Sequence, residues 1–400
     1  MSIRFSQLNN SLEINGFVHK VDNFRASLLN WFDENGRHWI PWKLTLDGRI
    51  PHRGEKLPVY GIWIAEVMLQ QTQLKVVLPY WQEWMKTFPT LISLAHANEN
   101  DVLLIWQGLG YYSRAKRIYQ SSKLLLDLIG YQDCIDTKNW PNSLEIWESL
   151  PGIGRSTAGS IISSAFDLPI PILDGNLKRV FLRLIASTNT PHQESYRLWN
   201  LSFYLLDKKF PRKFNQALMD LGALICTPSN PNCCECPINN YCLAYSKYNP
   251  KDFPVRQMKK SLPSYIIGIG IVMNSSGKIL IAQRKADNSM GGMWEFPGGK
   301  KEENELIEET IVREIKEEVD LDVEIVKKLI TFNHSYSHKK FQFIVCLCDL
   351  VAGTPKPLES NQVIWVDPNH LKDYPFPSAN TRIINEIFKY LEIRSKAIHN

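Results

Sequence analysis

The chain has 400 residues, of which 44% are hydrophobic, and its formal net charge is +5. This length is too great for one ordinary domain and predicts two or three. No apolar run approaches the roughly 20 residues that a membrane span needs, and the opening ten residues lack the apolar core of a secretory signal. These features favour a cytoplasmic protein without membrane contact. The mild positive charge permits a nucleic-acid partner without requiring one.

Helical patterning runs from about residue 21 to residue 225. Phe24, Leu28 and Phe32 recur at the spacing of one helix face, and residues 102–106 continue the pattern. Breaks between helices are predicted at Pro41, Pro89 and Pro141. Residues 49–57 (RIPHRGEKL) are polar and contain both proline and glycine, which predicts an exposed loop. We therefore expect an all-α domain over residues 21–225.

Glu66 stands inside an apolar helical segment, GIWIAEVMLQQTQ. An ionised carboxylate is costly in apolar surroundings, so we expect the pKa of Glu66 to be raised. A carboxyl group that stays protonated near neutral pH can donate its proton to a leaving group. The alternative is a glutamate on the polar edge of the helix, with no chemical role.

A glycine-rich turn and an aspartate follow in the same helical region. Residues 150–159 read LPGIGRSTAG, and Gly152 and Gly154 permit a tight turn into a helix whose free N–H groups can bind a phosphate. The same turn also fits a plain joint between two helices. Asp174 precedes another helical run, where the helix dipole favours its ionised form. Asp174 is thus a candidate catalytic carboxylate, with a simple helix cap as the alternative.

Five of the eight cysteines lie within residues 226–242. Four of them have the spacing C-x6-C-x2-C-x5-C, and these are Cys226, Cys233, Cys236 and Cys242. The segment 226–245 is too short and too rich in proline to bury a core, so we expect a bound metal to hold it. Zinc and an iron–sulfur cluster both accept four thiolates, although the six-residue gap is unlike the paired C-x2-C of zinc sites. Cys234 is interpreted as a bystander.

The pattern changes after the cysteine segment. Residues 246–263 are basic and broken by proline, which predicts a linker. Beyond it, strands are predicted at 265–273, 278–281, 341–348 and 363–366, and helices at 306–319 and 381–391. Residues 264–394 are therefore expected to form a smaller α+β domain.

Several stretches together resemble one family. EVMLQQTQ, GLGYYSRAKR, LPGIGRSTAG and ILDGN, followed by the cysteine spacing, are similar in order to the MutY-type adenine DNA glycosylases of the helix–hairpin–helix superfamily. The resemblance covers about residues 21–245 closely, and the C-terminal domain in architecture. It implies that the four cysteines hold a [4Fe–4S] cluster.

The resemblance also implies roles for individual residues. Glu66 matches the acid that protonates adenine and later activates water. Asp174 matches the carboxylate that stabilises the sugar cation, and Asn176 matches the side chain that helps to place the nucleophile. Gln71 and Tyr111 match residues wedged into the duplex beside the extruded base. A pair of carboxyl groups suits glycosidic cleavage, and a planar wedge suits base flipping.

Ser156 distinguishes two relatives of this domain. Endonuclease III resembles the same domain, but it has a lysine at the position of Ser156 and lacks the acid at the position of Glu66. A lysine there forms a Schiff base and cuts the strand, which a serine hydroxyl cannot do. With Gly152 and Gly154, Ser156 is assigned to the turn that contacts DNA. We therefore expect hydrolysis by water and an uncut strand.

Residues 299–321 match the Nudix box at eight of nine positions, with Asp320 in place of the last glycine. Aspartate tolerates a left-handed helix end better than most residues, so the backbone is expected to survive this change. Glu314, Glu317 and Glu318 share one helix face and, with Gly299, are candidates for binding Mg²⁺. The alternative is a solvated acidic helix.

The C-terminal domain of MutY-type proteins resembles Nudix hydrolases, usually with a decayed box, and recognises 8-oxoguanine. Residues 333–338 (NHSYSH) resemble the loop that touches this base, which makes Ser337 a candidate contact. The sequence thus predicts a monomeric, monofunctional glycosylase of the nucleoid that removes adenine opposite 8-oxoguanine or guanine in double-stranded DNA. The alternatives are an endonuclease III-like glycosylase/lyase, a nucleoside triphosphate pyrophosphatase with a DNA-targeting N-terminal half, and a non-catalytic lesion binder.

Overall fold

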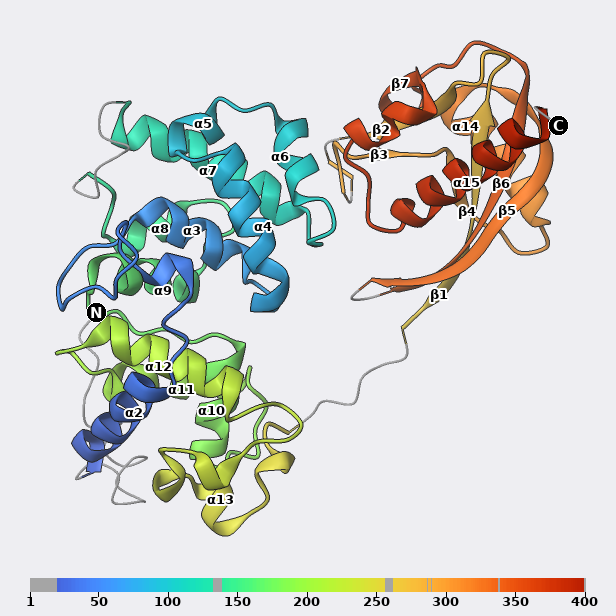
Figure 1. Ribbon diagram of the computed structural model, residues 1–400. Coiled ribbons are helices and arrows are strands. Elements are labelled where there is room, and N and C mark those ends of the chain that lie inside the picture. The colour runs from blue at the N-terminus through green and yellow to red at the C-terminus, as the bar shows by residue number, and fades with distance from the viewer. Residues whose placement is uncertain are drawn as a thin grey trace. The chain divides into compact units, whose positions relative to one another are not determined.

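The computed structural model describes residues 20–131, 139–255, 262–285, 287–288, 290–336 and 339–398. For residues 397 and 398 it describes the backbone alone. The chain divides into two compact units (Figure 1). The first consists of Met1–Ala95 and Gln120–Met258, and the second of His96–Tyr119 and Lys259–Asn400. Each unit has its own hydrophobic core, which agrees with the two or three domains predicted from the sequence length.

The first unit is built from helices. Its longer ones are α2 (Val21–Asn35), α3 (Val59–Met68), α4 (Leu74–Thr87), α5 (Leu91–Ala95), α8 (Leu144–Ser149), α9 (Arg155–Phe166), α10 (Gly175–Leu184), α11 (Ser195–Leu205), α12 (Pro211–Leu224) and α13 (Leu243–Lys247). Single turns of 3-10 helix are η3 (Pro41–Lys43), η4 (Cys233–Glu235), η5 (Asn239–Tyr241) and η6 (Pro250–Asp252). Helix α7 (Ser113–Ile129) begins in the second unit, which also contains α6 (Glu99–Trp106).

One core of the first unit joins α2 to α10, α11 and α12. Phe24, Leu28 and Phe32 are buried on the same face of α2, which confirms the face predicted from their spacing. On α10 and α12, the backbones approach so closely that a Cβ on Gly222 would lie 2.9 Å from the Cβ of Asn176. This contact fixes the first turn of α10, which carries the candidate catalytic residues.

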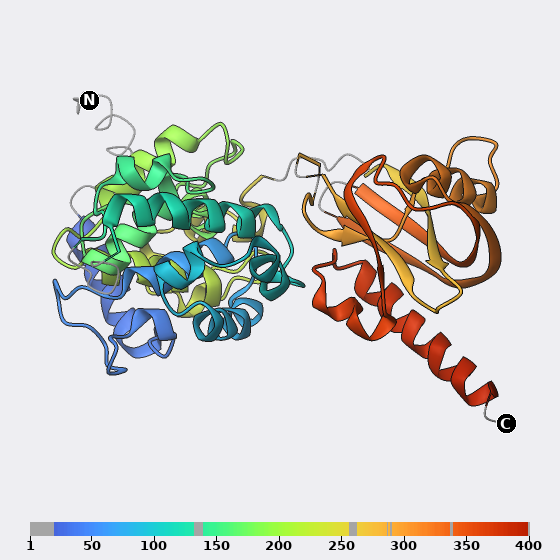
Figure 2. The same cartoon turned by 90° about the horizontal axis from the view of Figure 1, so that it is seen from above.

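The second unit contains a seven-stranded mixed sheet (Figure 2). Its strands are β1 (Ser264–Met273), β2 (Ile279–Arg284), β3 (Trp294–Glu295), β4 (Gly298–Lys300), β5 (Asp322–Tyr336), β6 (Lys339–Ala352) and β7 (Ser360–Val366). The main strand order is β3-β2-β1-β6-β5, with β4 paired to β1 and β7 paired to β2. Strands β1 and β6 run parallel, and the other pairs are antiparallel.

Helices cover both faces of this sheet. Ile271 belongs to a core with Ile383 of α15 (Asn380–Ile398), whereas the next residue, Val272, belongs to a core with Ile311 of α14 (Ile307–Val319). Successive side chains of a strand point to opposite faces, so this alternation places α14 and α15 on opposite sides. Gly270 lets α14 approach closely, because a Cβ there would lie 2.4 Å from Ile315.

The structure confirms the predicted fold class, strands and helices of this unit but adds a feature that the sequence did not reveal. Strand β5 is 15 residues long, and no strand was predicted there. Its residues are mostly partly or fully exposed and include several lysines and glutamates, so the alternation of apolar and polar side chains is weak. Short strands β3 and β4, and the 3-10 helix η7 (Pro368–Asp373), were also unpredicted.

The loop at residues 49–57 is exposed along most of its length, as predicted, and ends at the buried Leu57. Arg49 pairs with Glu55 within the loop, and the Gly54 amide donates to Asp167 at 2.7 Å. Within the described residues, no helix combines the length and apolar character that a membrane span requires.

Candidate active site

Glu66 lies on α3, a helix of ten residues of which the other nine are buried. Glu66 is the one partly exposed residue of this helix. Burial, the largest cause, raises the pKa of Glu66 from its ordinary value of 4.5 to about 7. Glu66 therefore has the elevated pKa that its apolar neighbours predicted, and it can hold a proton near neutral pH.

Asp174 is the N-cap residue of α10. One carboxylate oxygen accepts from the Leu177 amide at 2.7 Å, and the other lies 3.4 Å from the Asn176 amide nitrogen. The sequence argument from the helix dipole expected a pKa held low. Instead, burial raises the pKa of Asp174 above its ordinary value, while the Leu177 amide and the Arg179 charge oppose the rise. Desolvation of the carboxyl group therefore outweighs the effect of the helix dipole.

The carboxyl groups of Glu66 and Asp174 interact electrostatically. The charge of Asp174 contributes to the raised pKa of Glu66. A nearby negative charge disfavours ionisation of a carboxyl group, so the charge of Asp174 helps Glu66 to retain its proton.

Lys43 and Asp220 form a buried ion pair that sequence reasoning missed. The Lys43 ammonium lies 3.2 Å from one carboxylate oxygen of Asp220, and the Arg37 guanidinium lies 2.6 Å from the other. The charge of Lys43 lowers the pKa of Glu66, against the larger effect of burial. These residues therefore belong to the electrostatic surroundings of Glu66. No local pattern marks them, since Lys43 and Asp220 are 177 residues apart.

Asn176 and Arg179 connect the start of α10 to the cysteine segment. The Arg179 guanidinium donates to the Asn176 side-chain oxygen at 3.1 Å, to the Gly222 carbonyl at 2.6 Å and to the Cys226 carbonyl at 2.8 Å. Asn176 is thereby fixed in orientation, with its amide nitrogen toward Asp174.

The glycine-rich turn joins α8 to α9 as predicted. Gly152 has φ of +79°, a conformation that favours glycine, and Gly154 caps the start of α9. The Ser156 hydroxyl accepts from the Leu173 amide at 3.0 Å. Ser156 therefore links this turn to the residue directly before Asp174. Gln70 also contacts the turn, with its amide nitrogen 3.2 Å from the Gly152 carbonyl oxygen.

Gln71 and Tyr111, the predicted wedge residues, both adopt a left-handed backbone. Their φ values are +59° and +51°. Both side chains are exposed, Tyr111 to 46%. Non-glycine residues rarely adopt this conformation, and it occurs most often where function fixes the backbone. Arg114 stacks on the Tyr111 ring at 5.3 Å and supports it. The two residues fall in different units.

The four predicted cysteine ligands line one cavity, together with Arg183 and the apolar side chains of Val180, Leu184 and Leu221. Within the described residues, no three His, Cys, Asp or Glu side chains converge closely enough for a single metal ion.

Arg183 is a buried cation beside this cavity, and its role was also not predicted. Its guanidinium lies 3.2 Å from the Cys226 sulfur and donates to the Thr227 carbonyl at 2.7 Å. Burial raises the pKa of Cys236 to about 12 and that of Cys242 to about 11. Burial therefore favours the protonated form of these two thiols.

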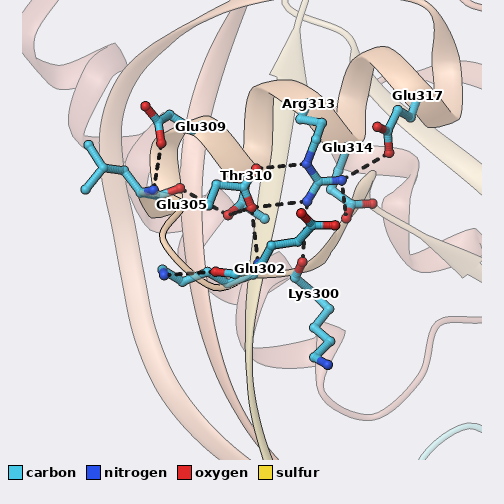
Figure 3. Close-up of polar contacts among 10 residues, drawn as sticks. Lys300, Glu302, Glu305, Glu309, Thr310, Arg313, Glu314 and Glu317 are labelled. Carbon is cyan, nitrogen blue, oxygen red and sulfur yellow. Dashed lines mark hydrogen bonds and ion pairs between the residues drawn. The ribbon is translucent and has the colours of Figure 1, made fainter.

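The Nudix helix α14 has Arg313 at the centre of its carboxylates (Figure 3). The Arg313 guanidinium lies 2.8 Å from Glu305, 2.9 Å from Glu314 and 3.0 Å from Glu317. Gly299 lies against Glu314 so closely that a Cβ would come within 2.2 Å of its carboxylate. The structure thus brings Gly299, Glu314 and Glu317 together, with a guanidinium between the carboxylates.

Glu318, on the same helix, contacts the backbone of β4. Its carboxylate accepts from the Gly298 amide at 3.0 Å, and burial, with the nearby charge of Glu295, raises its pKa to about 8.

Asp320 ends α14 with φ of +55°, which confirms that aspartate accepts the left-handed position. Its carboxylate pairs with Lys316 at 3.1 Å and with Lys356 at 2.8 Å. Ser337, the candidate contact to 8-oxoguanine, lies outside the described residues.

Two family models match the chain, one on each predicted domain. Residues 64–202 match the model described as "HhH-GPD superfamily base excision DNA repair protein". Residues 268–386 match the model described as "NUDIX domain". The first match contains Glu66, Gly152 and Asp174, and the second contains Gly299 and the Nudix helix.

Curated adenine DNA glycosylases are similar to this chain in sequence. An adenine DNA glycosylase of Buchnera aphidicola subsp. Schizaphis graminum is 32% identical over 375 residues, which cover 92% of this chain and 99% of the relative. The human adenine DNA glycosylase is 30% identical over 394 residues, covering 84% of this chain and 69% of the relative. The mouse enzyme is 39% identical over 233 residues, covering 58% of this chain and 43% of the relative.

Proposed function

Because this chain belongs to the adenine DNA glycosylase family, we propose that it removes adenine from double-stranded DNA where adenine is mispaired with 8-oxoguanine or guanine. The reaction is hydrolysis of the N-glycosidic bond in base excision repair. The observation that carries this proposal is Glu66, whose pKa is raised to about 7 beside the charge of Asp174. We expect the protein to act as a monomer on the DNA of the nucleoid.

Glu66 supplies the proton. Adenine is a poor leaving group as an anion, so protonation of its ring nitrogen N7 precedes or accompanies bond cleavage. With a pKa of about 7, the Glu66 carboxyl group holds a proton at neutral pH and gives it up readily. After the base departs, the same carboxylate accepts a proton from the attacking water.

Asp174 and Asn176 act on the sugar. Cleavage leaves an oxocarbenium-like cation, and the Asp174 carboxylate stabilises that charge. The Asn176 amide, whose oxygen is fixed by Arg179, orients the nucleophile beside it. Gln71 and Tyr111 fill the stack that the extruded adenine leaves, with their exposed side chains on left-handed backbones. Amides at Gly152 and Gly154 hold a phosphate of the backbone.

Ser156 supports an uncut product strand. Its hydroxyl is engaged by the Leu173 amide and offers no amine for a Schiff base. The endonuclease III-like alternative requires such an amine. Borohydride reduction during turnover is therefore expected to trap little protein–DNA adduct, and efficient trapping would return the lyase alternative to the lead.

We propose that the cysteine cavity holds a [4Fe–4S] cluster through Cys226, Cys233, Cys236 and Cys242. When bound, such a cluster supplies a fixed charge and a rigid cross-link for the segment. Arg183 donates toward the Cys226 sulfur and compensates thiolate charge. Purified protein is expected to contain about four irons per chain. Cys236→Ser should lose the iron and weaken DNA binding, whereas Cys234→Ser should do neither. Stoichiometric zinc without iron in anaerobically prepared protein would contradict the cluster.

We assign recognition of 8-oxoguanine to the C-terminal unit, with Ser337 as a contact. Deleting the chain after residue 263 is expected to leave adenine removal opposite guanine and to reduce the preference for 8-oxoguanine. Ser337→Ala should show a milder version, because one hydrogen bond contributes about 0.5–1.5 kcal/mol. An unchanged preference after truncation would assign the C-terminal unit another role.

The Nudix helix is a weaker candidate for Mg²⁺ binding and for nucleoside triphosphate hydrolysis. Arg313 lies between Glu314 and Glu317, so a metal ion must displace its guanidinium. Glu318 must also lose a proton, since its pKa is about 8. The two proposals separate in one experiment. Single-turnover excision on an A:8-oxoguanine duplex tests the glycosylase, and phosphate release from a nucleoside triphosphate with Mg²⁺ tests the hydrolase.

A further inference from the structure

A pocket of about 300 Å³ lies beside the first turn of α10. Its lining includes Gly175, Lys178 and Arg179 from α10, Pro228 from the cysteine segment, and Lys251 and Phe253 from the chain that follows α13. All of these residues belong to the first unit. Gly175 directly follows Asp174, so a ligand in the pocket lies next to the candidate catalytic carboxylate.

The charged residues that line this pocket are all positive. Lys178, Arg179 and Lys251 contribute three cations, and no carboxylate contributes to the lining. In the described part of the chain, the ammonium groups of Lys178 and Lys251 make neither an ion pair nor a side-chain hydrogen bond. The Arg179 guanidinium donates to uncharged oxygens, those of Asn176, Gly222 and Cys226. A hollow with three cations and no carboxylate in its lining attracts an anion.

These charges are concentrated at the pocket. The cysteine segment borders the pocket at Pro228, but residues 226–233 contain no lysine or arginine. Within the lining of this pocket, a phosphate would therefore be held by Lys178, Arg179 and Lys251. Phe253 and the neighbouring prolines give the remaining wall an apolar character, which suits the sugar that adjoins a backbone phosphate better than a hydrated free ion.

We propose that this pocket binds a backbone phosphate of the DNA strand from which adenine is removed, and that Lys178 and Lys251 are its charged contacts. This proposal rests on the glycosylase function above and adds a phosphate contact to it. A strand anchored at Gly175 lies next to Asp174 and is held near the reacting sugar. Lys178 and Lys251 are positioning residues, because they hold the strand and not the base.

The test measures binding rather than excision, so it does not depend on catalysis. The full-length protein is titrated against a duplex with a stable abasic analogue opposite 8-oxoguanine, at 0.05 M and 0.2 M salt. Each lost phosphate contact lowers the salt slope by about 0.9, so the Kd ratio between these conditions falls about threefold per contact. We expect this fall for Lys178→Gln and for Lys251→Gln. Lys247→Gln is the matched control, since Lys247 is exposed on α13 and does not line the pocket.

A second arm identifies the phosphate. Neutral methylphosphonates replace the phosphates around the abasic position one at a time, with wild-type protein and with Lys178→Gln/Lys251→Gln. We expect one position that weakens binding to the wild type and has no effect on the variant. Additive losses at every position would overturn the proposal, as would unchanged salt slopes in both single variants.

Inorganic phosphate gives the last arm. Protection of the wild type alone from thermal unfolding, with additive losses in the duplex scan, would assign the pocket to a free anion and overturn the strand contact. Unchanged melting temperatures of the variants without ligand show that they fold. A protein that passes the binding tests but removes no adenine would refute the glycosylase function and keep the phosphate pocket.

Discussion

Each unit of the molecule contains a glutamate with a strongly raised pKa, but the two glutamates have different neighbours. Glu66 is surrounded by apolar helix, and its pKa of about 7 results mainly from burial. Glu318 reaches about 8, again mainly through burial, with further contributions from other carboxylates. Beside Glu318, Arg313 contacts three carboxylates. At Glu66, Lys43 acts from a distance and is itself paired with Asp220.

These different surroundings suit Glu66 to proton exchange and suit the carboxylates around Arg313 to stabilising the fold. Glu66 is partly exposed as a residue, and the burial that raises its pKa outweighs the groups that lower it. Glu314 and Glu317 already share a cation, and Gly299 lies against Glu314. An intact motif is therefore compatible with a purely structural role in the second unit.

The largest expected effect is at Glu66. Glu66→Gln removes the acid, and general acid catalysis is typically worth about 10²–10⁴-fold, so single-turnover adenine excision should fall by at least that range. Duplex binding should change little. Glu83→Gln is the control, because Glu83 is exposed on α4 and forms an exposed ion pair with Lys86. Near-normal excision by Glu66→Gln would remove Glu66 from the mechanism.

The same substitution should stabilise the fold at alkaline pH. The folded pKa of about 7 exceeds the ordinary value of 4.5, so the folded state binds this proton more tightly than the unfolded state. Ionisation therefore costs stability progressively from pH 4.5 to 7, and fully above that. Gln pays no such cost, and Glu66→Gln should be more stable by up to about 3 kcal/mol at pH 8. Equal unfolding curves would contradict the raised pKa.

Next in size is the pH dependence of excision. Only the protonated Glu66 donates, so the single-turnover rate should be level below pH 7 and fall about tenfold per pH unit above it. The residual rate of Glu66→Gln should show no break near pH 7. If the break in the pH–rate profile persists in Glu66→Gln, it is caused by the titration of another group.

A smaller effect is expected at Arg313. Arg313→Gln leaves three carboxylates without their shared cation, which should lower the melting temperature by a few degrees at pH 7. The pKa of Glu305 is lowered to about 2, mainly by its hydrogen bond from Arg313. This contribution is present above pH 4.5 and disappears as pH falls through about 2, so the loss should shrink in acid. Lys389→Gln, which breaks one exposed pair with Glu386, is the control.

Adding Mg²⁺ tests whether the same carboxylates can bind a metal ion. If the carboxylates of α14 can serve as metal ligands, Mg²⁺ should raise the melting temperature of Arg313→Gln more than that of the parent protein. Equal shifts in both proteins would leave the Nudix helix without a metal site.

The smallest effect is expected at Ser156. Ser156→Ala leaves the buried Leu173 amide without its acceptor, at a cost of about 1 kcal/mol. Because Leu173 precedes Asp174, excision should fall severalfold while the break near pH 7 stays in place. Ser149→Ala is the control, since the Ser149 hydroxyl lies at an exposed helix end. If the break in the pH–rate profile shifts in Ser156→Ala, Ser156 instead influences the pKa of Glu66.

The sequence predicted those parts of the site that are marked by near neighbours. Glu66 is identifiable from the apolar residues beside it, and the cysteine set from its spacing. The Lys43–Asp220 pair and the contact of Arg183 with Cys226 could not be predicted, since 177 and 43 residues separate their members. The raised pKa of Asp174 was missed for a different reason. Its helix position is visible in sequence, but its burial depends on how the helices pack.

The contact between Gly299 and Glu314 bears on how catalytic signatures persist during evolution. Close packing favours glycine at position 299, because a larger residue would push the Glu314 carboxylate away from its pair with Arg313. Fold stability likewise favours Arg313 with its three carboxylates. A descendant of a hydrolase can therefore lose turnover and still retain almost every letter of the signature. In such a lineage, the inheritance of a motif records the ancestry of a scaffold, and only an assay records its present chemistry.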